Sequence, residues 1–240
     1  MFAAALMFFS LVLIRPALAE PALQFSSSFY PPVTSEQKNG ILDLVYQTLS
    51  ARLGIKITIH NQPAAERILL NVNAGLDDGV VGRVPGLEKI YPNLIIIPVP
   101  VMKFQMMAFA RDANFTASDP QSIQPYNIGI VRGWKILEAA ANGAQSVTTV
   151  DNGKQLFTML DKGRIDIALI EKLQGMEFIR QMRLHGIKML QPPLIEGKWY
   201  LYVNKRHAAL VPKLTAGLRE METDGTIERI YQTVVHRYIP

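Results

Sequence analysis

Two stretches of this chain repeat one pattern, and the repeat limits the possible folds more than any other feature. Residues 72–83 read VNAGLDDGVVGR, and residues 160–171 read LDKGRIDIALIE. In both, a helical segment stops at a glycine, an aspartate stands three residues later, and a short apolar strand follows. Glycine suits the left-handed residue that ends a helix, and aspartate suits a loop whose backbone it can hydrogen-bond. The repeat predicts two similar α/β halves.

Hydrophobic spacing outside the repeat alternates between strand and helix. Apolar residues recur at helical spacing between residues 41 and 53, and IKITIH at 55–60 alternates as a strand does. Strands that alternate with helices predict an α/β fold with mainly parallel sheets. We expect strands at 23–29, 55–60, 78–84, 94–101, 104–110, 128–131, 147–150, 166–170, 188–190 and 200–204, and helices at 40–53, 64–73, 134–141, 153–160, 173–184, 207–221 and 226–236.

Composition excludes several kinds of site. Cysteine is absent, which excludes thiol catalysis, disulfides and cysteine-bound metals. The four histidines include no pair at the helical spacing of a zinc site, so we expect no metal and no cofactor. Lys plus Arg is 25 and Asp plus Glu is 20, a net charge of +5. That excess is too mild to indicate a nucleic-acid partner.

The N-terminus has the pattern of an export signal. Residues 1–14 (MFAAALMFFSLVLI) are apolar apart from one serine, and Ala17-Leu18-Ala19 follows. A short apolar run ending in Ala-x-Ala is typical of a secretory signal peptide, here cleaved after Ala19. A membrane anchor or a buried helix is the alternative. With the signal peptide at 1–19, we expect a periplasmic protein.

A charged residue ends each copy of the repeat. Arg83 and Glu171 each stand five residues beyond the aspartate of their copy. In parallel α/β sheets, ligands bind outside the carboxyl ends of the strands. Two facing halves would therefore place Arg83 and Glu171 on opposite walls of a cleft, where they would suit a ligand with carboxylate and ammonium groups. The alternative is that both charges are solvated at strand ends.

Further candidate residues lie in loops that follow strands. Arg132, Gly133 and Trp134 join an expected strand to a helix N-terminus, where free N–H groups favour an anion. Arg132 offers a planar guanidinium and Trp134 a ring face for stacking. The alternatives are a surface arginine and a tryptophan that anchors the core. Tyr30 follows the first strand and is either a ligand contact or a turn residue.

The order and spacing of these motifs resemble a known family. Tyr30-Pro31-Pro32, GILDL at 40–44, GLDD at 75–78 and GRID at 163–166 are similar to the periplasmic solute-binding proteins of family 3. These are the polar amino acid binders of ABC importers. The resemblance implies the type II periplasmic binding fold, with two lobes joined by crossover strands near 106–111 and 200–204. Lobe one would hold 20–108 and 200–240, and lobe two 109–199.

The resemblance also implies roles for residues. Glu171 occupies the place of the family's aspartate that binds the ligand ammonium, and an aromatic at Tyr30 would lie over the ligand. The family's carboxylate-binding arginine has Ile90 in its place here, so Arg83 or Arg67 would replace it. The predicted ligand-binding residues are Tyr30, Arg67, Arg83, Arg132, Gly133, Trp134 and Glu171, with no catalytic residue.

These observations favour a monomeric binding protein that captures a small amino-acid-like or carboxylate solute for a membrane ABC permease. Two alternatives remain open. One is a dehydratase-like enzyme on the same scaffold, with Glu171 as its acid or base. The other is a sensory domain that acts through a membrane partner.

Overall fold

The computed structural model describes residues 22–62, 64–111 and 116–238, so the predicted signal peptide lies outside the described residues. The strands are β1 (Ala22–Ser27), β2 (Lys56–Asn61), β3 (Gly79–Arg83), β4 (Leu94–Ile96), β5 (Met102–Arg111), β6 (Asn127–Val131), β7 (Ser146–Val150), β8 (Ile167–Glu171), β9 (Ile187–Met189) and β10 (Ile195–Asn204). The helices are α1 (Ile41–Leu53), α2 (Ala65–Ala74), α3 (Lys135–Ala140), α4 (Gly153–Asp161), α5 (Lys172–Gln181), α6 (Val211–Thr223) and α7 (Thr226–Tyr238), with 3-10 turns η1 (Leu87–Lys89) and η2 (Lys205–Leu210).

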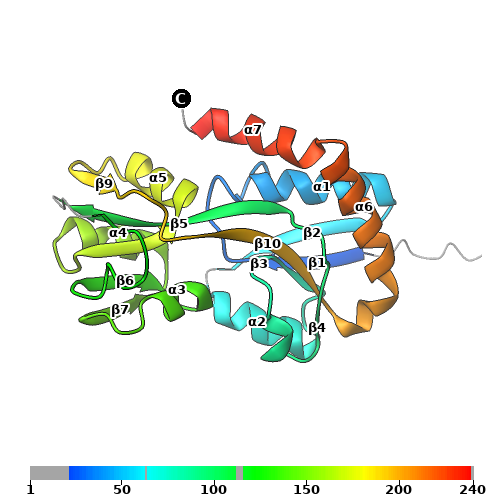
Figure 1. Cartoon of the computed structure of the whole chain (residues 1–240). Helices are drawn as coiled ribbons and strands as arrows, with labels where there is room; N and C mark the ends of the chain where they lie inside the picture. Colours follow the sequence, from blue (N-terminus) through cyan, green and yellow to red (C-terminus); the bar gives the residue numbers. More distant parts are fainter. Residues whose placement is uncertain (1–21, 63, 112–115, 239–240) are drawn as a thin grey trace, which may run out of the picture.

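The strands form two parallel groups joined by antiparallel strands (Figure 1). In the first group β1 pairs with β2 and β3, and in the second β6 pairs with β7 and β8. Between the groups, β10 runs antiparallel to β3 and β5, and β5 runs antiparallel to β8. The predicted α/β fold is confirmed, with a sheet that is mixed as a whole. We call β1–β4 with α1, α2, α6 and α7 the first lobe, and β6–β9 with α3–α5 the second.

Two long strands, β5 and β10, cross from one lobe to the other. They pair with each other over Met102–Met106 and Ile195–Trp199 before they separate into different lobes. The predicted crossover segments, 106–111 and 200–204, are the far ends of these strands. The expected strand at 94–101 is shorter, because β4 ends at Ile96 before Pro98 and Pro100, which lack the N–H group that a sheet requires.

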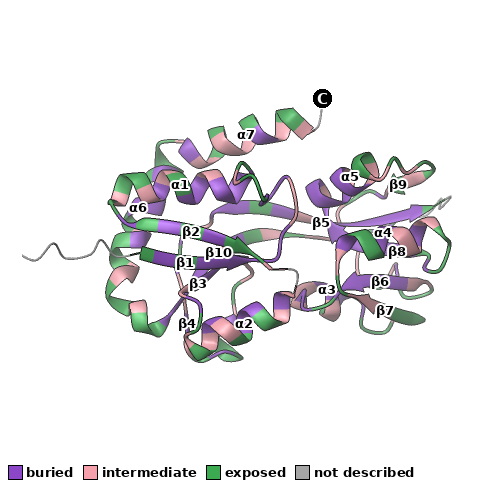
Figure 2. Ribbon diagram, turned by 180° about the vertical axis from the view of Figure 1, so that it is seen from behind, coloured by how far each residue is buried: buried purple, intermediate pink, exposed green. Residues whose placement is uncertain are grey.

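Buried residues, purple in Figure 2, occur in both lobes, and each lobe contains a pair of packed aromatic rings. In the first lobe, the rings of Phe25 and Tyr46 meet edge to face at 5.8 Å. In the second, Phe109 and Phe157 meet at 5.5 Å. Both lobes thus bury large side chains, and these belong to one continuous hydrophobic core that includes residues of the crossover strands.

The sequence repeat is also a repeat of hydrogen bonds. Gly75 and Gly163 both take a positive φ, of 77° and 63°. Asp78 accepts from the backbone N–H of Gln24 at 2.7 Å and Asp166 accepts from that of Asn127 at 2.8 Å. Each aspartate also donates its own N–H to the carbonyl of the same partner. The predicted role of these aspartates, tying the loop backbone, is confirmed.

Candidate functional site between the lobes

Arg83 ends β3 and lies against the loop that follows β1. Its Nη2 donates to Ser28 Oγ at 3.0 Å, and its guanidinium carbon lies 5.5 Å from the centre of the Phe29 ring. Its buried Nε has no hydrogen-bond partner among the described residues. Burial lowers the pKa of Arg83 to about 10, which still leaves the group cationic at neutral pH. Arg83 therefore carries a positive charge and an unused donor inside the protein.

A small cavity of about 40 Å³ lies beside Arg83, between the lobes. The first lobe contributes Phe29 and Gly82 to its wall, the second contributes Gly133 and Trp134, and the crossover strands contribute Met106 and Trp199. The Phe29 ring lies 5.6 Å from that of Trp134 and 4.3 Å from that of Trp199. A pocket for a small organic ligand has a volume of about 300 Å³ or more. The lobes must therefore move apart before such a ligand can enter.

The loop that contains Gly133 and Trp134 contacts the first lobe directly. Gly133 has a φ of +83°, and a Cβ added there would lie 2.5 Å from the backbone N of Glu66. Trp134 is 6% exposed and its buried Nε1 has no hydrogen-bond partner within the described residues. The tryptophan thus packs against Phe29 of the opposite lobe and presents a second unused donor.

Polar contacts hold the two lobes together around this cavity. Lys135 Nζ lies 2.6 Å from Glu66 Oε2, and the Tyr91 hydroxyl donates to Glu66 Oε1 at 2.7 Å. The backbone N–H of Tyr30 donates to Gln174 Oε1 at 2.9 Å. The contacts of Lys135 with Glu66 and of Tyr30 with Gln174 join residues of opposite lobes, and we call this arrangement, with the lobes in contact, the closed form.

The remaining predicted residues take different positions. Arg67 is exposed on α2, and Arg132 is exposed with its Nε 3.5 Å from Asp151. Neither lines the cavity beside Arg83. Tyr30 packs its ring at 5.1 Å from that of Phe178 in the second lobe, and its buried hydroxyl has no hydrogen-bond partner among the residues described. The structure thus brings Arg83, Gly133 and Trp134 together, with Tyr30 at the lobe interface.

Glu171 lies elsewhere. It is 1% exposed, and its Oε2 accepts from the backbone N–H of Gln174 at 3.1 Å, which caps α5. Burial raises the pKa of Glu171 to about 7. The residue lines a second, larger cavity and not the one beside Arg83. The expected pair of opposite charges, Arg83 and Glu171, therefore does not meet across one cavity in the closed form.

Several residues of the interface were missed by sequence reasoning. Phe29, Glu66, Gln174 and Trp199 make contacts between the lobes or line the cavity. Phe29 is next to Tyr30 in the sequence and Trp199 alternates with residues of a strand, but nothing local distinguishes these aromatics from core residues. The contacts of Glu66 and Gln174 could not be predicted from neighbouring residues, because their partners are distant along the chain.

Comparisons with known proteins agree with this architecture. No protein-family model matches the sequence. A protein from Shewanella oneidensis, itself uncharacterized, is 27% identical over 204 residues, which cover 79% of this chain and 74% of that protein. An ancestral arginine-binding protein bound to arginine superposes with a TM-score of 0.76 at 18% identity, covering 92% of this chain and 99% of that one.

A histidine kinase sensor domain with similarity to periplasmic binding proteins superposes with a TM-score of 0.78 at 17% identity, over 92% of this chain and 96% of that one. The chain therefore has the two-lobe fold of periplasmic binding proteins, as the resemblance implied. In the part of the chain that is described, no helix combines the length and apolar character that a bilayer span needs. Nor do three or more of its metal-ligating side chains gather at one point.

Proposed function

We propose that the protein is a periplasmic solute-binding protein that captures a small carboxylate solute of amino-acid size between its lobes and passes it to a membrane ABC permease. Residues 20–108 with 200–240 would form one lobe and 109–199 the other. Residues 1–19 would be the cleaved signal peptide. The protein would act as a monomer and would not catalyse a reaction, because a membrane partner can detect the bound ligand through closure of the lobes.

One observation supports this proposal: two donors, Arg83 Nε and Trp134 Nε1, are buried at the same interlobe cavity and have no acceptor among the described residues. Buried donors are almost always paired. A guanidinium and an indole N–H together suit a carboxylate, whose oxygens only accept. The Tyr30 hydroxyl, at the lobe interface, is a third donor that has no acceptor in the part of the chain that the structure describes. We propose Arg83, Gly133, Trp134 and Tyr30 as the ligand-binding residues.

The lobe contacts indicate how binding and closure would be coupled. Ligand entry requires that the bonds of Lys135 to Glu66 and of Tyr30 to Gln174 break. Both Lys135 and Glu66 are about one-third exposed, with side-chain exposures of 37% and 35%. A pair that is exposed to this extent contributes about 1 kcal/mol or less. This ion pair therefore contributes only a small part of the free energy that holds the lobes together.

The enzyme alternative has less support. Glu171, its candidate acid or base, uses its carboxylate to cap α5. A capping carboxylate has a structural role that its position explains without chemistry. The sensor alternative shares the same cleft and differs only in the partner that detects closure.

The proposal can be tested by thermal unfolding of the protein in the presence of amino acids and their decarboxylated amines. A ligand at about 100 times its Kd should stabilise the folded state by about 2.7 kcal/mol, and the carboxylate should be required. Arg83→Met should weaken binding about 10-fold to 100-fold, because a hydrogen bond to a charged group contributes about 1.5–3 kcal/mol. Trp134→Phe keeps the ring, removes the donor and should weaken binding less.

Arg132→Met is the matched control, since it removes an exposed arginine of the same loop region and should leave affinity unchanged. Binding by Arg83→Met and Trp134→Phe with the affinity of the natural sequence would exclude this site. Chemical conversion of the bound compound, followed by mass spectrometry, would instead favour the enzyme.

A further inference from the structure

A second cavity lies behind the crossover strands, on the face opposite to Arg83 and Trp134. Its volume is about 520 Å³, within the range of small-molecule sites. Successive residues of a strand point to opposite faces, and partners in register share a face. Lys103 pairs with Lys198. Their neighbours Phe104 and Trp199 stack with each other at 5.1 Å, and Trp199 lines the cavity beside Arg83. The two cavities are thus separated by the crossover strands themselves.

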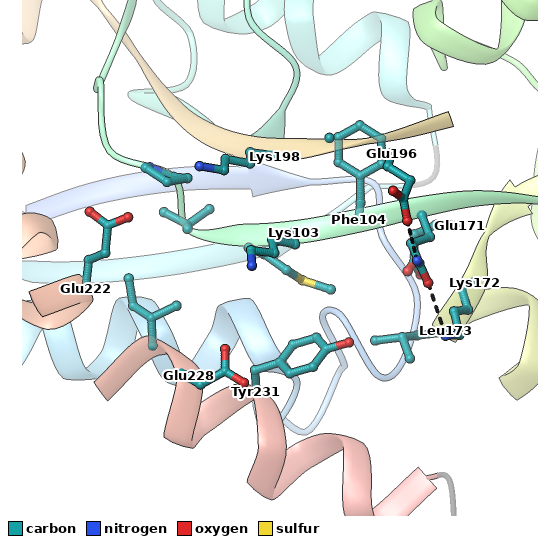
Figure 3. Close-up of a pocket in the computed structure, with 16 residues that line it drawn as sticks. Lys103, Phe104, Glu171, Lys172, Leu173, Glu196, Lys198, Glu222, Glu228 and Tyr231 are labelled. Atoms are coloured by element: carbon teal, nitrogen blue, oxygen red, sulfur yellow. Dashed lines mark hydrogen bonds between the residues drawn. The ribbon is translucent and has the colours of Figure 1, made fainter. Parts of the chain in front are cut away.

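Four of the charged side chains that line this cavity form two opposed pairs, and the others are Glu171, Lys172 and Glu196. Lys103 and Lys198 project from the crossover strands, and Glu222 and Glu228 lie across from them on α6 and α7 (Figure 3). Within the described parts of the chain none of the four belongs to an ion pair, and the one side-chain hydrogen bond among them joins Gln232 Nε2 to Glu228 Oε1 at 2.7 Å, which leaves the charge of Glu228 unneutralised. The cavity therefore has a positive wall and a negative wall that do not neutralise each other through contact.

The lysine pair is unfavourable by itself. Like charges that stand directly opposite each other on neighbouring strands destabilise a sheet. No carboxylate of the described residues lies within ion-pair distance of either lysine. The other lysine of the cavity, Lys172, instead donates to Gln105 Oε1 at 3.1 Å. An anionic group placed between Lys103 and Lys198 would remove this repulsion.

The cavity is lined by both lobes. Glu222, Glu228 and Tyr231 come from the first lobe, while Glu171 and Leu173 come from the second. Its floor is the pair of crossover strands about which the lobes would move. A molecule bound there touches both bodies, so it favours the lobe arrangement in which its contacts are best.

We infer that this cavity is a second binding site, which takes a dipolar solute with its anionic group at Lys103 and Lys198 and its cationic group at Glu222 and Glu228. The half-buried ring of Tyr231 offers an apolar surface for the carbon chain between the two charges. The site is separate from the interlobe cleft and does not depend on which solute the cleft binds.

Calorimetric titration of the full-length protein with ε-aminocaproate tests the inference, because this probe carries one carboxylate and one ammonium at the ends of a flexible chain. We expect saturable binding at millimolar concentration, stronger than that of succinate, which has two anionic ends, or cadaverine, which has two cationic ends. The double variant Lys103→Met/Lys198→Met should weaken binding at least 10-fold, and Glu222→Gln/Glu228→Gln should do so from the opposite wall.

The control is Lys56→Met/Lys188→Met, which removes two exposed lysines outside the cavity and should leave binding unchanged. Arg83→Met distinguishes this site from the cleft, because it removes a residue of the cleft and keeps both charged walls of this cavity. Loss of binding in Arg83→Met with no effect of the lysine variant would place the probe in the cleft and overturn the inference. Equal binding of all three probes, or no binding by any of them, would overturn it as well.

Discussion

Arg83 and Glu171 end equivalent strands, one in each lobe, and the same aspartate hydrogen bonds recur in both lobes. The two side chains nevertheless have different roles. After β8 the chain enters α5 at once, so Glu171 becomes the N-cap and its carboxylate is used by the helix. After β3, residues 84–86 lead to the 3-10 turn Leu87–Lys89. Arg83 is therefore not the N-cap of a helix. The connection that follows a strand therefore decides whether a strand-end charge supports the fold or is available to a ligand.

The two strands also differ in the residue that precedes Arg83 and Glu171. Ile170 precedes Glu171 in an ordinary strand, whereas Gly82 precedes Arg83 with a φ of +66°. A Cβ added to Gly82 would lie 2.3 Å from the Phe29 ring, which is held between Trp134 and Trp199. Gly82→Ala should destabilise the protein by about 3 kcal/mol, measured by urea unfolding, since backbone strain and overpacking add.

Gly163→Ala is the matched control for that variant. Its φ is +63° and nothing lies within 4 Å of an added Cβ. Gly163→Ala should therefore lose only the about 1–2 kcal/mol that a left-handed backbone costs a residue with a Cβ. Equal losses in the two variants would show that Phe29 is not held tightly in the interface.

The second prediction concerns Glu171 and pH. Because burial raises its folded-state pKa to about 7, above the value of the unfolded chain, the folded state binds the proton more strongly. Its contribution to stability is complete below the unfolded pKa and is lost as pH rises through 7. Between about pH 5 and about pH 8 this should cost about 2 kcal/mol.

Glu171→Gln keeps an acceptor for the cap and cannot titrate, so urea unfolding of this variant should lack that part of the pH dependence. Glu36→Gln, on an exposed residue, is the control and should retain it. The same loss of stability with pH in Glu171→Gln as in the natural sequence would mean that the carboxyl is ionised throughout.

The third prediction compares the two repeat aspartates. Asp78 accepts from the Gln24 N–H and also from Arg206 and His207, whereas Asp166, among the described residues, accepts from the backbone and side chain of Asn127. Burial by itself would raise the pKa of Asp78, but these hydrogen bonds outweigh it and lower the pKa. Asp78→Asn should therefore cost about 1 kcal/mol more than Asp166→Asn in urea unfolding at neutral pH.

That difference should shrink as the solution is made acidic, because stability from a carboxylate of lowered pKa is lost as pH falls through that pKa. If the two variants were equally stable at neutral pH, the contacts of Arg206 and His207 with Asp78 would contribute nothing.

The fold was predictable wherever its signals were local. Helices α1 and α2 begin and end within about a residue of their expected bounds, because Gly54 and Gly75 stop them. The first half of β10, Ile195–Trp199, was not predicted as a strand. Its side chains point alternately to the two cavities, and its strand form depends on pairing with β5, which is far away in the sequence.

The candidate site was predictable only in part. Arg83, Gly133 and Trp134 follow strands, and the rule that ligands bind at strand ends identified them. The same rule chose Glu171 and Arg132, and the family resemblance suggested Arg67, but neither could foresee an N-cap, an ion pair with Asp151 or an exposed helix face. Those outcomes depend on which element packs beside each residue.

The sequence by itself determined the repeated unit of helix, glycine, aspartate and strand, since each part acts through φ angles and hydrogen bonds within a few residues. Only the tertiary structure decided which face of the crossover strands each side chain occupies. The packing of the lobes on the two faces of these strands places Arg83 and Trp134 at one cavity and Glu171, with Lys103 and Lys198, at the other. The physical reason is that burial and charge pairing between distant segments exist only after the lobes have packed.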